Sequence, residues 1–136
     1  MKALFEYLKS TRNQPWKRGV NDCCTLVAGA VMAQRGFDPM KEYRGYKTEL
    51  GAIKALRKQG YESLHEAFSA KFKEVPKTLA KTGYIVLLSS KHNQNADKQI
   101  NGYMGVKTPS GVWIIGEHGG GEIHPDINEI LAVWEV

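Results

Sequence analysis

Hydrophobic residues in the first third of the chain recur at helical spacing. Apolar positions near the N-terminus share one helical face, so residues 2–11 are expected to form a short amphipathic helix. Residues 23–35 are apolar on almost every side, and they lie between Asp22, a residue type that caps helix N-termini, and Gly36, a common C-terminal stop. This second run therefore predicts a central buried helix.

Two further helical patterns follow, and the pattern then changes to that of strands. Residues 48–59 and 63–70 have apolar positions at helical spacing, so they predict two peripheral helices. Beyond Pro76, β-branched and aromatic runs bounded by Gly, Pro, Asn and Ser are typical of strands. The expected strands are Tyr84–Leu88, Tyr103–Lys107, Val112–Ile115 and Leu131–Val136.

The order of these elements indicates the fold class. The turn signal Thr108-Pro-Ser-Gly111 separates two of the expected strands, so residues 103–115 predict an antiparallel hairpin. Helices come first and the sheet second, an order that favours an α+β fold over an alternating parallel sheet. The chain has 136 residues and no repeat or linker-like tract, so one domain is expected over residues 1–136.

The chain is basic, with a formal net charge of +5 and a pI near 9.2. A charge of this sign attracts polyanions in general. The Lys and Arg residues are spread along the chain, whereas nucleic-acid domains usually concentrate them together with aromatic residues. They are therefore interpreted as a solvated surface, and no nucleic acid is expected as a specific partner.

Neither a membrane span nor a signal peptide is expected. No stretch reaches the roughly 20 apolar residues that cross a bilayer, and residues 1–10 lack the apolar run and cleavage site of a signal peptide. The two cysteines, Cys23 and Cys24, are neighbours, and adjacent residues on a helix do not meet ordinary disulfide geometry. Free thiols suit folding in the reducing cytosol.

Cys23 is the centre of the expected chemistry. It directly follows the cap of the predicted central helix, where the positive end of a helix macrodipole favours the reactive thiolate form of a cysteine. Cys24 lies about 100 degrees further round the helix and is expected to face the interior, although the sequence leaves the opposite assignment open. The alternative is that both thiols are small buried hydrophobic groups, as free cysteines often are.

The sequence around Cys23 resembles a known nucleophile motif. The segment Trp16-Lys-Arg-Gly-Val-Asn-Asp-Cys-Cys-Thr-Leu-Val27 is similar in order and spacing to the motif of the NlpC-type cell-wall cysteine peptidases, a papain-like family. It is closer still to a phage-tail branch, in which Asp-Cys-Cys opens the helix and a segment like Tyr43-Arg-Gly-Tyr46 follows. The resemblance covers residues 14–60 and implies a papain-like (NlpC-type) fold, with the nucleophile helix packed on an antiparallel sheet.

The same resemblance implies roles for particular residues. In that family the cysteine, here Cys23, attacks an amide carbonyl, while a histidine on the first strand of a hairpin acts as base and a polar residue on the next strand orients it. Tyr103 takes the place of this histidine, since Tyr103-Met-Gly-Val106 matches the other positions of the family's His-Val-Gly-like motif. Tyr84 likewise replaces an acidic residue. Because a tyrosine is a poor base at neutral pH, the usual dyad is expected to be broken.

Two histidines are candidates for a replacement base. His118, in the segment Glu117-His-Gly-Gly-Gly121 that is expected to be a mobile polar loop, and His92, in the loop before the hairpin, could each reach the thiol in space. His65, in a predicted surface helix, and His124, in a predicted turn, are not expected to be catalytic. Neither the histidines nor the cysteines show metal-ligand spacing, so neither a metal nor a cofactor is expected.

The remaining aromatic residues have two expected roles. Trp16, Trp113 and Trp134 lie next to apolar positions, so they are expected to pack in the core or at its edge rather than to stack on sugars or bases. Tyr43 and Tyr46 flank an arginine, a combination that is common in protein contact surfaces, and they are candidate interface anchors.

Three functions are compatible with these observations. The first, favoured by Tyr103 and Tyr84, is a phage tail-tip or baseplate component that assembles in the host cytoplasm and uses the fold to contact other tail or baseplate proteins in the virion. The second is an active amidase or endopeptidase that cuts the peptide stems of peptidoglycan as the DNA enters the host, with Cys23 as nucleophile and His118 as displaced base. The third is a cytosolic basic binding module with buried thiols.

Overall fold

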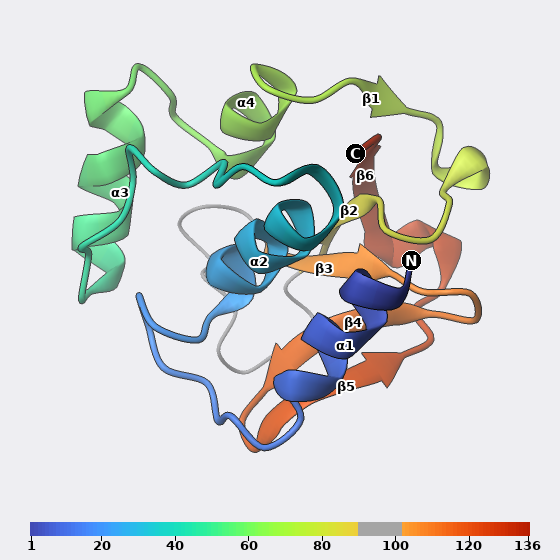
Figure 1. The fold of residues 1–136 in the computed structure, drawn as a ribbon. Helices are drawn as coiled ribbons and strands as arrows, with labels where there is room; N and C mark the ends of the chain where they lie inside the picture. Colours follow the sequence, from blue (N-terminus) through green and yellow to red (C-terminus); the bar gives the residue numbers. More distant parts are fainter. Residues whose placement is uncertain (90–101) are drawn as a thin grey trace.

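The computed structural model describes residues 1–89 and 102–136 and shows the helices before the sheet (Figure 1). The helices of this described part are α1 (Lys2–Ser10), α2 (Cys23–Arg35), α3 (Glu49–Lys58) and α4 (Leu64–Ser69). Its strands are β1 (Glu74–Val75), β2 (Ile85–Leu88), β3 (Tyr103–Lys107), β4 (Val112–Gly116), β5 (Gly119–Ile123) and β6 (Ile130–Trp134). Two short 3-10 helices, η1 (Lys77–Leu79) and η4 (Ile127–Glu129), precede β2 and β6. The predicted α+β class is confirmed.

All the strands belong to one antiparallel sheet with the order β1-β6-β2-β3-β4-β5. The C-terminal strand β6 lies between β1 and β2, so the first and last described strands pair at one edge of the sheet. The predicted hairpin is confirmed, because β3 and β4 pair through Val106 and Trp113, and the turn closes with a hydrogen bond from Thr108 N to Gly111 O at 2.9 Å.

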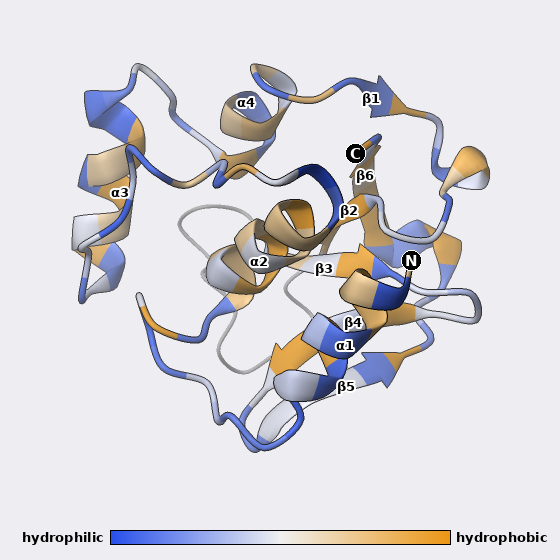
Figure 2. Ribbon diagram, in the orientation of Figure 1, coloured by the Kyte–Doolittle hydropathy of each residue, from blue (hydrophilic) through white to orange (hydrophobic). Residues whose placement is uncertain are grey.

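The central helix α2 packs against β3 and β4 and lies beside α1 (Figure 1). Figure 2 shows hydrophobic colours along most of α2, whereas part of the surface of α3 is hydrophilic. Leu26, Val27 and Val31 of α2 are completely buried, and they belong to the main core cluster together with Met104 and Val106 of β3. Burial on nearly all sides is what the continuous apolar run of α2 requires.

The ends of α2 have the capping residues that the sequence predicts. At its N-terminus the Asp22 side chain accepts a hydrogen bond from Thr25 N at 2.9 Å, and the Thr25 hydroxyl accepts one from Asp22 N at 2.8 Å. This reciprocal capping box satisfies two backbone donors that the helix leaves unpaired. At the C-terminus Gly36 has a φ of 76°, the left-handed conformation that ends helices.

Two tryptophans fill the core as expected. Trp134 is fully buried and its indole N–H donates to the Ser69 hydroxyl at 3.1 Å. Trp113 is also buried and donates to the Thr11 hydroxyl at 2.9 Å. Each ring therefore buries its apolar area while its single donor is satisfied. Trp16 is half-buried and packs against the main core cluster.

The interpretation of the glycine run as a mobile loop is wrong. Gly119–Ile123 is strand β5, which pairs with β4 along its whole length. Thr11, the residue that caps the C-terminus of α1, helps to hold these glycines as a strand. Gly120 N donates to Thr11 O at 2.9 Å on the edge of β5 that does not pair with β4. The absence of side chains permits the contact: a Cβ on Gly120 would lie 2.1 Å from the Thr11 hydroxyl oxygen and 2.6 Å from the indole nitrogen of Trp113.

Gly120→Ala is therefore expected to destabilise the protein by about 1–3 kcal/mol. The added methyl group would collide with Thr11 and Trp113, which already fill the space beside Gly120. Gly121→Ala is the matched control, because a Cβ there meets nothing within 4 Å. Urea unfolding of both variants measures the difference. Equal stability of the two would show that α1 does not close on the strand in this way.

Candidate functional site

The two thiols lie at the N-terminus of α2. Cys23 is the first residue of the helix and Cys24 the second. Neither forms a disulfide, both are half-buried, and their sulfur atoms lie 4.0 Å apart. Cys23 also contacts the second core cluster, which Cys24 does not. The thiols are therefore neither bridged nor sealed in the interior, and the prediction of free thiols is confirmed.

Tyr103 shares the surroundings of Cys23. It is the first residue of β3, is 2% exposed, and belongs to the apolar cluster against which Cys23 packs. Burial raises the pKa of Tyr103, and negative charge on Glu129 and on Cys23 raises it further. The Tyr103 phenol consequently stays protonated at neutral pH and does not accept the proton of the thiol.

The structure places no described histidine beside the thiols. His118 lies exposed in the turn between β4 and β5, and no described hydrogen bond, ion pair or ring contact connects it with Cys23. His65 Nε2 lies 2.6 Å from the Glu74 carboxylate, and His124 Nδ1 lies 3.0 Å from Ser110 O. His92 lies outside the described residues.

Tyr84, which stands where the resembling family has an acidic residue, is part of the sheet's framework. It directly precedes β2, is half-buried and packs against the second core cluster. Its backbone carbonyl accepts from Lys107 N at 2.9 Å, and its N–H donates to Lys81 O at 3.0 Å. Its described contacts hold the start of β2 against the end of β3.

Asp22 connects the thiol helix to two other segments. Its side chain is buried, with 5% of the residue exposed. Besides the helix cap, its second oxygen accepts from Gly19 N at 2.7 Å and from the Tyr46 hydroxyl at 2.6 Å. Gly19 has a φ of 79°, and a Cβ there would lie 2.2 Å from Tyr46 O. The turn before the helix therefore packs directly on the backbone at Tyr46.

Burial raises the pKa of Tyr46, and the negative charges of Cys24 and Asp22 add to this effect. The Tyr46 hydroxyl therefore remains a hydrogen-bond donor over the whole range in which proteins are folded. It is directed at Asp22 instead of at the surface, so Tyr46 is a structural residue and not the free interface anchor that its sequence context indicates.

Residues 38–46, called the strap below, run from the end of α2 back to Asp22. An ion pair holds the strap in shape: Arg44 donates from Nε to Asp38 Oδ2 at 2.7 Å, and the other Asp38 oxygen accepts from Met40 N at 2.9 Å. The Arg44 guanidinium is the main cause of a lowered pKa of the Asp38 carboxyl. The ion pair thus joins the start of the strap to Arg44, two positions before Tyr46.

A narrow groove opens between the N-terminus of α2, the strap, α3 and α4, with a cavity volume of about 70 Å³. Its lining consists of Trp16, Arg18, Asp22, Cys23, Cys24, Pro39, Met40, Tyr43, Tyr46, Ala52, Ala55, Leu56, Leu64, Ala67, Phe68, Lys71 and Phe72. Apolar and aromatic side chains dominate this set, and both thiols belong to it. The sequence analysis found the thiols and tyrosines and predicted α3 and α4 as peripheral helices, but it did not identify their apolar positions as walls of a groove.

The described surroundings of Cys23 can be compared with what acyl transfer requires. A thiol nucleophile needs a base that takes its proton and returns it to the leaving group, and the described residues around Cys23 offer a protonated phenol instead. Within the described ranges, no group of three or more His, Cys, Asp or Glu side chains could hold a metal ion.

Tyr46→Phe is expected to lower the free energy of unfolding by about 1.5–3 kcal/mol, because it removes a hydrogen bond to a buried carboxylate. Tyr43→Phe is the matched control, since no described hydrogen bond involves its hydroxyl. Denaturant unfolding measures both variants. If Tyr46→Phe were as stable as the control, the hydrogen bond from Tyr46 to the Asp22 carboxylate would not contribute to stability.

Comparison with known proteins assigns the chain to a family but does not indicate an activity. None of the described helices has the length and apolar character to span a membrane, and no curated protein matches the sequence. The profile of the family described as "Domain of unknown function (DUF6950)" matches residues 1–136. The chain therefore belongs to the DUF6950 family.

Proposed function

We propose that this protein is a phage tail-tip or baseplate component in which a papain-like, NlpC-type fold serves virion assembly and no longer performs catalysis. The resemblance of residues 14–60 to the phage-tail branch of that superfamily suggests the fold and the location. The arrangement of a cysteine-bearing helix on an antiparallel sheet is compatible with it.

The proposed loss of catalysis is supported mainly by one observation, the burial of Tyr103. Tyr103, which stands where the resembling family has its histidine, is buried with 2% of its surface exposed, in the apolar cluster against which Cys23 packs. A buried phenol with a raised pKa neither activates the thiol nor protonates a leaving amine. The surroundings of the thiol are a packed apolar wall on the sheet side, which favours a structural use of the fold.

The second candidate function is an active amidase or endopeptidase acting on peptidoglycan. The position of Cys23 favours it, because the thiol lines an open groove at a helix N-terminus and so remains accessible to a substrate. This alternative needs a base, for which His118 and His92 are the candidates. The two functions therefore differ in whether an imidazole acts on Cys23.

Alkylation of Cys23 at different pH values distinguishes them. In a Cys24→Ala background, the labelling rate is expected to rise with pH without a second titration step, because no imidazole assists the thiol. Tyr103→His places an imidazole beside Cys23, and it is expected to raise the rate at neutral pH by about tenfold. Tyr103→Phe is the control that removes only the hydroxyl group.

Two results would contradict the loss of catalysis in this experiment. One is fast labelling of the wild-type thiol at neutral pH that shows a second titration step. The other is loss of that step when His118 or His92 is replaced by Ala. Either result would identify an imidazole partner and favour the enzyme.

The assembly role itself is tested in a phage whose copy of this gene is inactivated. Such a phage is expected to produce particles with incomplete tails in electron micrographs, and Cys23→Ala is expected to restore plaque formation as well as the wild-type gene does. Complete tails without the protein would exclude an assembly role. Complete tails together with failure of Cys23→Ala to restore infection would indicate the enzyme.

A further inference from the structure

We infer that the groove beside the thiols is a docking site for an acidic peptide segment of a partner protein, anchored by an apolar side chain. The inference depends on the proposed function in one respect only: the partner is taken to be a neighbouring tail protein. The site itself is argued from the lining, the charges and the shape of the groove.

The groove has an apolar floor that continues onto the outer surface. Phe68 and Phe72, which line it, are stacked with ring centroids 6.2 Å apart, and Phe72 stacks in the same way on Phe37. Phe37 is 41% exposed, so the row of rings leads from the groove to solvent. An apolar surface that is both hollowed and open is typical of the pockets that accept an anchoring side chain.

Two cations lie at the edges of this floor, each against an aromatic ring. The Arg18 guanidinium lies 5.1 Å from the centre of the Trp16 ring, and the Lys71 ammonium lies 5.6 Å from that of Tyr43. All of these residues line the groove. Cations held over aromatic faces keep their charge while they face a ligand, so the edges of the groove favour negatively charged groups.

The residues that line the groove carry little negative charge of their own. Asp22 is the carboxylate of its lining, and three hydrogen-bond donors already occupy the two oxygen atoms. Lys71 donates to Glu42 at 2.9 Å, but the Glu42 side chain is 48% exposed. An exposed pair of this kind contributes little stability, so a carboxylate of the partner can replace Glu42 at small cost.

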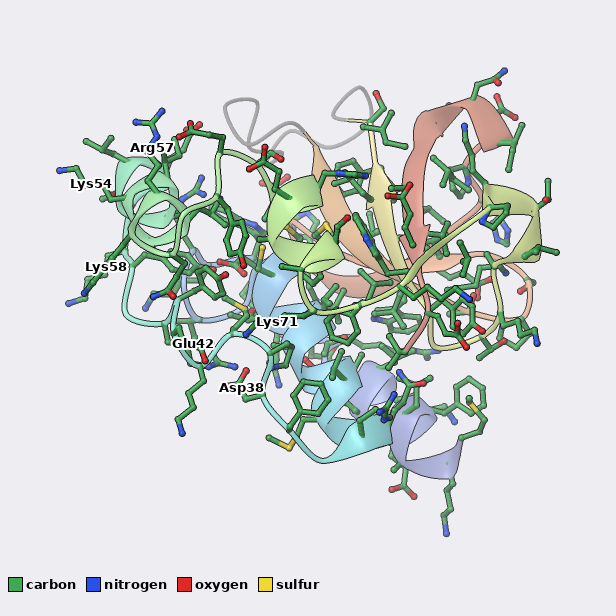
Figure 3. All side chains as sticks on the ribbon, turned by 90° about the horizontal axis from the view of Figure 1, so that it is seen from above. Asp38, Glu42, Lys54, Arg57, Lys58 and Lys71 are labelled. Carbon is green, nitrogen blue, oxygen red and sulfur yellow. The ribbon has the colours of Figure 1, made fainter. Side chains whose placement is uncertain are left out.

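The wider surroundings of the groove carry the same sign of charge. Residues 38–62, which include the strap and α3, contain six Lys or Arg and four Asp or Glu, a net charge of +2. Figure 3 shows Lys54, Arg57 and Lys58 pointing outward from α3, while Glu42 and Lys71 lie on the adjoining face. This field steers an acidic partner toward the groove.

The shape of the site favours a peptide over a nucleic acid. Proteins bind unpaired bases by stacking them on open aromatic faces, whereas Arg18 and Lys71 cover the faces of Trp16 and Tyr43. The groove is lined mainly by apolar side chains, which suit an apolar anchoring side chain of a peptide better than the polar edges of a base. The glutamates of an acidic segment would then pair with the cations at the edges.

The test uses a fluorescent synthetic peptide of about twelve residues with Phe-Leu at its centre and Glu on both sides, and measures anisotropy with the full chain. The comparison probes carry Ala-Ala at the centre, Lys in place of Glu, or are double-stranded DNA. The acidic Phe-Leu peptide is expected to bind about tenfold more tightly than each of these, and added salt is expected to weaken its binding.

Variants of the protein locate the site. Lys71→Gln removes one edge cation and is expected to weaken binding about tenfold, whereas Lys2→Gln removes the same charge from α1, away from the groove. Ala55→Leu fills the groove and is expected to abolish binding, whereas Ala70→Leu makes the same change at an exposed position outside the lining. Circular dichroism confirms that each variant is folded before it is compared.

Equal binding of the Phe-Leu and Ala-Ala peptides would overturn the inference, since charge alone would then explain it. Tighter binding of DNA, or unchanged binding by both Lys71→Gln and Ala55→Leu, would overturn it as well. The plaque experiment is independent of these results. If plaques require the protein but the peptide does not bind, only the docking site is wrong; if the peptide binds and tails form without the protein, only the tail assembly role is wrong.

Discussion

The Asp22 carboxylate is the group on which the functional half of this protein depends. A buried carboxylate is unfavourable unless donors compensate for the water it loses. Here the donors come from three different segments: Thr25 in the helix, Gly19 in the turn before it, and Tyr46 at the end of the strap. The hydrogen bonds that satisfy one charge therefore also fix the position of the thiols relative to the groove.

The same geometry explains why a cysteine at a helix N-terminus is here part of a binding surface. Cys23 has the helix position that favours a thiolate, yet the sheet presents Tyr103 to it, and the buried phenol keeps its proton. On the other side, Arg18 and Lys71 frame an apolar groove. The groove thus combines positive edges, an aromatic floor and a wall that contains both thiols.

Local sequence patterns predicted the helices and four of the strands close to their observed bounds. Capping and apolar periodicity act within one helix, so Asp22 and Gly36 identified the ends of α2 without further information. Strands β1 and β5 were missed. Gly119–Ile123 has the composition of a loop. It becomes a strand because the neighbouring β4 pairs with one edge and Thr11, from the far end of the sequence, accepts a hydrogen bond from Gly120 N at the other edge.

The sequence by itself determined the capped helix, the free adjacent thiols and the tyrosine at position 103, because each is a matter of residue type or of spacing within a few positions. Only the tertiary structure decided that Tyr103 is buried in the cluster against which Cys23 packs, that Tyr46 donates to Asp22, and that α3 and α4 line a groove beside the thiols. Side chains at these sites meet through the packing of whole elements, and the burial that fixes their protonation and partners does not exist before the elements assemble.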